Sequence, residues 1–378
     1  MENLTFAVPC LFGLEGLAAN ELRRLDLNGV RAENGRVLFT GGPEALVRSN
    51  LWLRTGERVL LRLGVFPAAT PDQLFEGVRA LPLEDFIPKD GAFPVKGHCL
   101  DSNLMSVPNC QKTIQKAAAL RLGEKYHMNR LPATGTKFQL QFSIMKNTAE
   151  IFLDTSGAGL HKRGYRAVGN DAPLRETLAA AMVELARFRG RDPFLDPFCG
   201  SGTIVIEAAL TAKNRAPGLA RGFAAERYPW VPEALWQEQR SAAIEREFHG
   251  DYRIYASDTD PRSVDIARAN AKKAGVSGLI DFTEADAVTR ALPAAQGVLV
   301  CNPPYGERLL ERKEAQALYR RLGGRLERET GWGQYIISSE PEFERHFGRK
   351  AAKKRKLYNG MIPCYLYMYP ENKENKRK

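Results

Sequence analysis

The spacing of apolar residues divides the chain into two halves with different patterns. In the first half, strand-like runs such as LTFAVPCL and GRVLFTG alternate with helix-like runs such as LEGLAANELRRL and PEALVRSNLW. A period-two alternation, typical of a β-hairpin, runs through KFQLQFSIMKNTAEIFLDTSG, and the segment VPNCQKTIQKAAALRLGEKY indicates a basic helix. This half therefore predicts a mixed α and β region.

The pattern changes near residues 157–165, where the chain becomes rich in glycine, arginine and lysine. We place a domain junction there. Beyond it, short apolar runs such as RIYASD and QYIISS alternate with helical patterns such as TIVIEAALTA and PRSVDIARANAKKAG. This alternation of strands and helices predicts a mostly parallel, doubly wound α/β sheet.

The first strand of the second region ends at an aspartate and a glycine loop, in LDPFCGSGTIVIEAAL. Gly200 and Gly202 allow a ligand to approach the backbone closely, and Asp196 can accept hydrogen bonds from a cation or a hydroxyl. A phosphate-binding loop would place a lysine after Gly202, and a dinucleotide-binding loop would have glycine in place of Val205. The loop therefore suits a ligand other than a polyphosphate.

Two further strands end in acidic residues. Asp258 lies where doubly wound folds hold a ribose diol, and Asp260 either shares that site or caps the helix that begins at Pro261. Asp286 follows a third strand and either contacts a purine amine or caps a loop. Because the carboxyl ends of parallel strands share one edge of a sheet, we expect these side chains and Asp196 to surround one ligand.

A fourth strand runs into the sequence NPPY, residues 302–305. Proline lacks an N–H group, and the residue before a proline favours extended backbone, so neither a helix nor a continued strand fits here. Asn302 and the loop carbonyls are therefore expected to form a rigid set of hydrogen-bond acceptors beside the flat ring of Tyr305. An ordinary strand-ending turn is the alternative for this loop taken alone.

The composition narrows the class of partner. The 378 residues carry a formal net charge of +11, which favours a polyanion such as nucleic acid over a membrane surface. No apolar run reaches the ~18 residues of a membrane span, and the start of the chain lacks the basic residues of a signal peptide. Six cysteines without paired spacing argue against a metal site and against disulfides, so we expect a cytoplasmic protein without a metal.

Taken together, the motifs resemble a known family. DPFCGSGTI, SDTD, NPPYGERL and KKRKLYNG, with DTSGAGLHKRGYR and APLRETLAAAM before them, are similar to the THUMP-domain RNA methyltransferases, and most to the bacterial guanine-N2 methyltransferases of 23S ribosomal RNA. The resemblance covers essentially the whole chain. It implies a Rossmann-like class I methyltransferase domain with a seven-stranded doubly wound sheet, preceded by a mixed α+β region that contains the THUMP RNA-binding module. The implied domains are 1–60, a ferredoxin-like segment, 61–157, the THUMP domain, and 158–378, the methyltransferase.

The resemblance also implies the reaction, with S-adenosylmethionine (SAM) as cofactor and S-adenosylhomocysteine (SAH) as product. The Asn302 side-chain oxygen and the Pro303 carbonyl would accept hydrogen bonds from a guanine N2 amine and aim its lone pair at the methyl donor. Tyr305 would stack on a base that has left its helix, and Pro304 completes the catalytic loop. The implied cofactor ligands are Asp196, Pro197, Gly200, Gly202, Asp258, Asp286 and Asn302.

Basic segments supply the expected RNA contacts, because lysine and arginine bind phosphates. We expect the C-terminal NKENKRK to be a disordered, solvated end instead. The insertion between Ile206 and Arg253 is expected either to shape the substrate cleft or to cover the sheet. The candidate RNA ligands are Lys112, Lys116, Lys162, Arg163, Arg166, Lys353, Lys354 and Arg355.

Several alternatives stay open on the sequence alone. The NPPY chemistry suits adenine N6, in RNA or DNA, as well as guanine N2, and a transfer RNA guanine is another candidate target. A protein glutamine amide would fit the loop but not the basic segments. A ribosome-assembly factor that binds RNA without catalysis would not need the intact Asp196, Asp258 and glycine loop. We therefore expect RNA as the partner, either 23S ribosomal RNA or a precursor of the 50S particle, and no membrane.

Overall fold

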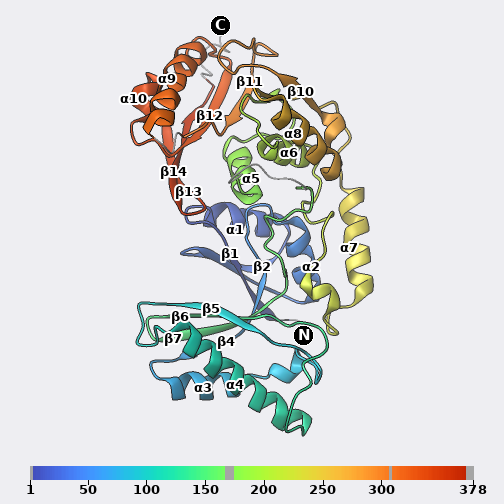
Figure 1. Ribbon diagram of the computed structural model, residues 1–378. Coiled ribbons are helices and arrows are strands. Elements are labelled where there is room, and N and C mark those ends of the chain that lie inside the picture. Colours follow the sequence, from blue (N-terminus) through green and yellow to red (C-terminus); the bar gives the residue numbers. More distant parts are fainter. Residues whose placement is uncertain (1–2, 167–173, 306–308, 372–378) are drawn as a thin grey trace.

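The computed structural model describes residues 3–166, 174–305 and 309–371. The predicted disordered tail, 372–378, and parts of two quoted motifs, 172–173 and 306–308, lie outside these residues. Figure 1 shows the C-terminal half at the top and the N-terminal half below it, with α3 and α4 at the far end. None of the helices in the described ranges is long and apolar enough to cross a membrane.

The N-terminal half is built on one mixed sheet with the strand order β2-β3-β1-β4-β7-β6-β5. Only β5 and β6 pair in parallel. Because β1 pairs with β4, the sheet runs without a break across the predicted boundary at residue 60, and that boundary stays a prediction. The elements are β1 (Leu4–Pro9), α1 (Glu15–Arg24), β2 (Asn28–Glu33), β3 (Arg36–Gly41), α2 (Pro43–Trp52), β4 (Leu60–Pro67), α3 (Pro71–Arg79), η1 (Leu83–Asp85), β5 (Val95–Leu100), α4 (Val107–Tyr126), β6 (Leu140–Met145) and β7 (Thr148–Asp154).

The C-terminal half contains the predicted seven-stranded sheet, in the order β10-β9-β8-β11-β12-β14-β13. The strands from β10 to β12 pair in parallel, and β14 and β13 add an antiparallel edge. The elements are α5 (Glu176–Leu185), β8 (Phe194–Asp196), α6 (Thr203–Ala212), η2 (Ala224–Arg227), α7 (Glu233–Glu245), β9 (Ile254–Asp258), α8 (Pro261–Ala274), η3 (Ser277–Leu279), β10 (Ile280–Glu284), β11 (Gly297–Cys301), α9 (Leu309–Leu326), β12 (Trp332–Ser338), α10 (Phe343–Phe347), β13 (Lys353–Asn359) and β14 (Ile362–Tyr369).

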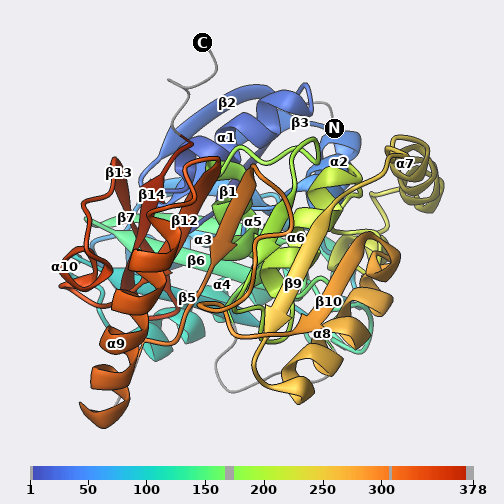
Figure 2. The ribbon, with the colours of Figure 1, turned by 90° about the horizontal axis from the view of Figure 1, so that it is seen from above.

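Helices bury both faces of this second sheet. One apolar cluster joins α5, α6 and α8 to the strands, and another joins α9 and α10. Figure 2 looks onto the sheet, with β10 and β13 towards its two ends. The strand order reverses between β8 and β11, and the crevice at such a reversal is where doubly wound sheets bind ligands. This positions a candidate site at the carboxyl ends of β8, β9 and β11.

The insertion after α6 belongs structurally to the N-terminal half. Its Phe223, Tyr228 and Trp236 are buried in the same apolar cluster as the residues of the first sheet. The ring of Tyr228 stacks on that of Phe138 with centroids 4.6 Å apart, and its hydroxyl donates to the Asp154 carbonyl at 2.7 Å. Figure 1 shows α7 running down the side of the molecule towards the N-terminal half. The insertion therefore packs on the first sheet and joins the two halves, while its expected role in shaping the substrate cleft stays a prediction.

Candidate active site

The glycine loop lies between β8 and α6 and is held by the neighbouring strand. The Gly200 N–H donates to Oδ2 of Asp258 at 2.9 Å, and the Cys199 N–H donates to the Ser257 carbonyl at 2.9 Å. Gly202 has a φ of +84°, and a Cβ atom there would lie 2.9 Å from the Ala267 side chain. A larger residue at this position would therefore be strained and would displace α8, which explains the requirement for glycine.

The structure separates the roles of the two aspartates after β9. Asp258 accepts from the backbone of Gly200 with one oxygen and from that of Asp260 with the other, at 3.1 Å. Asp260 caps α8, since its side chain accepts from the Arg262 N–H at 3.1 Å and from the Ser263 hydroxyl at 3.0 Å. Asp260 is thus the helix cap that was one of its two candidate roles. Each Asp258 oxygen has a second lone pair, which leaves room for ligand hydroxyls.

Asp196 is a buried acid in which one of the two carboxylate oxygens has a hydrogen-bond partner. The side chain is 1% exposed, and its Oδ1 accepts from the Phe198 N–H at 3.0 Å. Oδ2 is fully buried and has no hydrogen-bond partner among the described residues. Burial, together with the nearby charge of Asp258, raises the pKa of this carboxyl to about 8. A cationic ligand would satisfy this oxygen and stabilise its ionised form.

Two tyrosines donate hydrogen bonds to the loop after β11, which carries Asn302. The Tyr305 hydroxyl donates a hydrogen bond to Oδ1 of Asn302, and the Tyr319 hydroxyl donates to the Pro304 carbonyl at 2.7 Å. Tyr305 packs against the apolar cluster formed by α5, α6, α8 and the strands, and this burial raises the pKa of its hydroxyl well above the usual value. The tyrosine is therefore a neutral donor that orients the Asn302 amide.

A pocket of about 590 Å³ lies at the carboxyl ends of these strands and collects most of the predicted residues. Asp286 lines it while also capping the next turn, because its Oδ1 accepts from the Val288 N–H at 2.6 Å. The structure does not bring Pro197, Gly202, Pro303 or Tyr305 to the pocket wall. The lining includes Asp196, Gly200, Asp258, Asp286, Asn302 and Pro304 from the predicted set, and also Phe198, Ser201, Thr203, Thr259 and Leu318.

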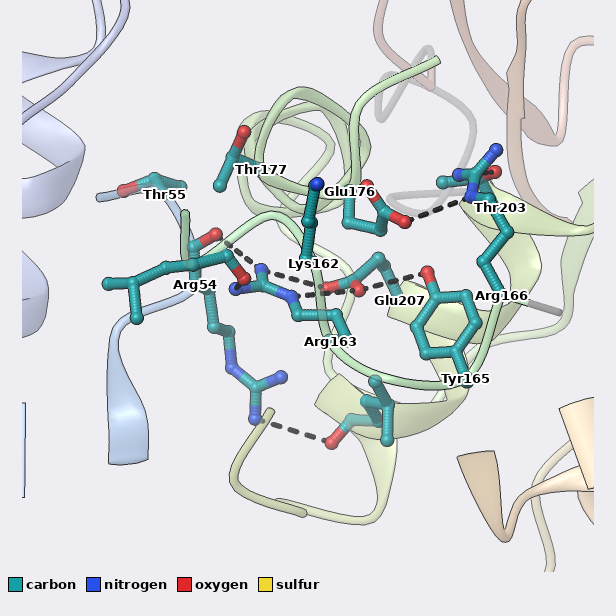
Figure 3. Close-up of polar contacts among 12 residues, drawn as sticks. Arg54, Thr55, Lys162, Arg163, Tyr165, Arg166, Glu176, Thr177, Thr203 and Glu207 are labelled. Atoms are coloured by element: carbon teal, nitrogen blue, oxygen red, sulfur yellow. Dashed lines mark hydrogen bonds and ion pairs between the residues drawn. The ribbon is translucent and has the colours of Figure 1, made fainter. Parts of the chain in front are cut away.

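One of the predicted RNA ligands, Arg163, lies inside the protein and is a correction. Its side chain is 2% exposed and forms an ion pair with Glu207 of α6, from Nε to Oε1 at 3.3 Å. The guanidinium also donates to the Leu160 carbonyl at 2.8 Å and to the Arg54 carbonyl at 2.5 Å. Figure 3 shows Arg163 between the Arg54 backbone and Glu207. Arg163 therefore joins the N-terminal half to the helix after the glycine loop and does not contact RNA.

Arg166 is partly buried, and its contact with RNA stays a prediction. Its guanidinium donates to Glu176 at 3.1 Å and to the Thr203 hydroxyl at 3.0 Å, at the start of α6. The other candidates lie at the surface: Lys112, Lys116, Lys162, Lys353 and Lys354 are exposed. Lys354 pairs with Glu344 at 3.0 Å, and Arg355 donates to the Gly13 carbonyl of the N-terminal half.

Comparison with protein families identifies the chain. Residues 163–368, more than half of its length, match the family described as "RMKL-like, methyltransferase domain". The chain belongs to the RMKL-like methyltransferase family. Residues 5–60 match the "RlmL ferredoxin-like domain" and residues 68–154 match the "THUMP domain".

Relatives of this RMKL-like methyltransferase include the "Putative RNA methyltransferase YpsC" of Bacillus subtilis (strain 168). It is 42% identical over 381 residues, which cover 100% of this chain and 99% of YpsC. The "Ribosomal RNA large subunit methyltransferase K/L" of Syntrophotalea carbinolica is 35% identical over 94% of this chain. Only 52% of that protein is matched, so the chain spans about half the length of this K/L relative.

Solved structures share the fold closely. The structure of a "predicted N6-adenine-specific DNA methylase" from Listeria monocytogenes is 42% identical with a TM-score of 0.94, covering 98% of this chain and 97% of that one. SMU.472, which is complexed with SAH, is 39% identical with a TM-score of 0.93, covering 99% of both chains.

The cofactor of this methyltransferase family is SAM, and the pocket residues fit it. The unpartnered Asp196 oxygen offers an acceptor to the ammonium group that SAM carries. Asp258 and Asp286 line the same pocket and offer further acceptors for ribose hydroxyls and a purine amine. A volume of about 590 Å³ also lies within the range of typical small-molecule sites.

Proposed function

We propose that this methyltransferase modifies the exocyclic N2 amine of a guanine in 23S ribosomal RNA. One observation carries the proposal: Asn302 lines the same pocket as Asp196 and Asp258, so the amine acceptor and the cofactor residues share one cavity. RNA as the substrate class is supported by the net charge of +11, the THUMP match and the names of the YpsC and K/L relatives. The name of the K/L relative favours large-subunit ribosomal RNA, which we take to be 23S ribosomal RNA, free or in a precursor particle.

In this proposal the chain contributes positioning rather than a base or a nucleophile. When bound, SAM supplies an electrophilic methyl group. Asn302 Oδ1 already accepts from Tyr305, and its second lone pair accepts from the substrate amine. Pro303 does not line the pocket, so its carbonyl stays the predicted second acceptor, which together with Asn302 would direct the nitrogen lone pair towards the methyl group. The amine proton then leaves to solvent.

The geometry changes the role proposed for Tyr305. The ring packs against the apolar cluster and does not line the pocket, and its hydroxyl is committed to Asn302. We therefore assign Tyr305 as a positioning residue for Asn302, while its stacking on the target base stays a prediction. Cys301, beside this loop, is fully buried and its thiol has a strongly raised pKa, so it has no role as a nucleophile.

Adenine N6 is the second candidate target. The name of the Listeria structure favours it, and an adenine amine presents the same donors to Asn302 and Pro303 as a guanine amine.

A labelling experiment separates these functions. The purified chain is incubated with methyl-labelled SAM and, separately, unmodified 23S ribosomal RNA and transfer RNA transcripts, and the products are digested to nucleosides. We expect labelled N2-methylguanosine from the 23S transcript. Label in N6-methyladenosine would favour the second candidate, and label in neither RNA would refute RNA methylation.

A further inference from the structure

The hairpin of β13 and β14 ends in an exposed apolar tip. Met361 is 94% exposed and is the most exposed large apolar side chain in the described residues, and its neighbour Ile362 is 39% exposed. Gly360 precedes them with a φ of +64° and closes the turn between the two strands. Exposing a whole methionine side chain to water gives the folded protein no burial energy, so the tip suggests a partner.

The tip projects on the side of the sheet that holds the cofactor pocket. β14 runs antiparallel to β12 and pairs with it up to Ser338 at the carboxyl end of β12, opposite Tyr365. The turn at Gly360 therefore extends past the same edge from which the Asn302 loop leaves β11. Strand β14, which leads back from this turn, contacts the Asn302 loop, because the Sγ atom of Cys364 lies 4.0 Å from the Tyr305 hydroxyl. Met361 is three residues beyond Cys364, roughly 10 Å along an extended strand.

The strand that carries the tip is basic. Lys353, Lys354 and Lys356 of β13 are all exposed, and Lys356 lies 5.6 Å from the ring centroid of Tyr358. An exposed apolar tip on a cationic strand complements RNA, in which the phosphates lie outside and the stacked bases inside. An apolar protein surface would not require the lysines. Proteins that distort nucleic acids insert apolar side chains between bases in this way.

We infer that Met361 and Ile362 enter the base stack of the substrate RNA beside the target nucleotide. The inference rests on the proposed function, because a base must leave its stack before its amine can reach Asn302. Unstacking is costly, and the methionine side chain offsets part of that cost by filling the space that the target base vacates. Lys356, the exposed lysine of the three that lies nearest the tip, contacts a phosphate of the same RNA strand.

Two RNA hairpins test the inference, once the methylated nucleotide has been mapped with the wild-type protein. In one hairpin the target nucleotide is paired, and in the other it faces an abasic site, where flipping costs least. Met361→Ser is expected to lower kcat/KM roughly tenfold on the paired RNA and less than about twofold on the abasic RNA. Met361→Leu, which keeps an apolar side chain, is expected to retain the wild-type activity on the paired RNA.

The matched control is Met105→Ser, a methionine that is 59% exposed in the loop before α4. Its ratio of activities on the two RNAs is expected to equal that of the wild type. Equal effects of Met361→Ser on both RNAs, or no effect on either, would overturn the inference. So would full activity on both hairpins with a loss only on ribosomal particles, which would assign the tip to a protein partner. A wild-type protein that methylates no RNA would instead refute the proposed function.

Discussion

The hydroxyl of Tyr305 donates a hydrogen bond to Oδ1 of Asn302, three residues earlier in the same loop. This contact fixes the Asn302 amide before any substrate arrives, because the Tyr305 ring is itself held by packing against the apolar cluster of α5, α6, α8 and the strands. A preorganised acceptor costs no reorganisation when the target amine binds. The loop thus combines rigid prolines with a side chain whose orientation is set by its neighbour.

Tyr305→Phe removes the donor while keeping the ring. We expect kcat for methyl transfer to fall by up to about tenfold, the effect of one neutral hydrogen bond, because the Asn302 amide is then free to rotate. The dissociation constant of SAH should not change, since Tyr305 does not line the pocket. Steady-state kinetics with RNA and calorimetry with SAH check both values. An unchanged kcat would show that Asn302 does not need this partner.

Asn302→Ala tests the acceptor directly. Removal of a preorganised polar group from a reacting centre typically lowers kcat by ~100-fold or more, and we expect a loss of at least this size. Binding of SAH should be retained, because Asp196, Asp258 and the glycine loop are intact in the variant. Methyl transfer at the wild-type rate in Asn302→Ala would refute the assigned mechanism.

The raised pKa of Asp196 predicts that the affinity for the cofactor depends on pH. Its pKa of about 8 keeps the carboxyl largely protonated at neutral pH, whereas a bound cation favours the ionised form. Binding below pH 8 therefore releases a proton, and affinity should rise with pH by at most about tenfold per unit and level off above that pKa. The readout is the ratio of SAM affinities of wild type and Asp196→Asn, since the amino group of SAM titrates equally in both. A ratio that is independent of pH would contradict the role of Asp196.

Alanine variants of Arg163 and of its neighbour Lys162 are expected to have opposite effects on stability and on RNA binding. Arg163→Ala leaves Glu207 buried without its ion-pair partner, and the loss of one partner of a buried pair costs about 3–5 kcal/mol of unfolding free energy. Lys162→Ala removes an exposed charge and should leave stability unchanged while it weakens RNA binding and reduces its salt dependence. Denaturant unfolding and RNA titrations at two salt concentrations measure these effects. Equal stability of the two variants would contradict the structural role of Arg163.

The sequence predicts the second sheet and the edge that holds the pocket, because buried strands and amphipathic helices leave strong apolar patterns. The helix predicted from TIVIEAALTA has the bounds of α6, Thr203–Ala212. The sequence does not predict the edge strands β2 and β13, since few of their side chains are buried and few are apolar. Strand pairing, rather than an apolar face, determines these two elements.

Long-range partners explain the errors at the site and at the surface. LHKRGYR looks like a basic surface segment, and nothing near Arg163 in the sequence indicates that Glu207 will bury it from 44 positions away. The partner of the Tyr305 hydroxyl, Asn302, is local, but the burial that holds the Tyr305 ring comes from residues of other elements, which the sequence does not indicate. The pocket hydroxyls of Ser201 and Thr259 were overlooked although both lie within the predicted motifs GSGT and SDTD.

The most direct measurement is nucleoside mass spectrometry of ribosomal and transfer RNA from cells with and without this protein, followed by mapping of the methyl group that is lost. We predict the loss of N2-methylguanosine at one position of 23S ribosomal RNA, restored by the wild-type gene and not by Asn302→Ala. Loss of N6-methyladenosine instead, or restoration by Asn302→Ala, would contradict it.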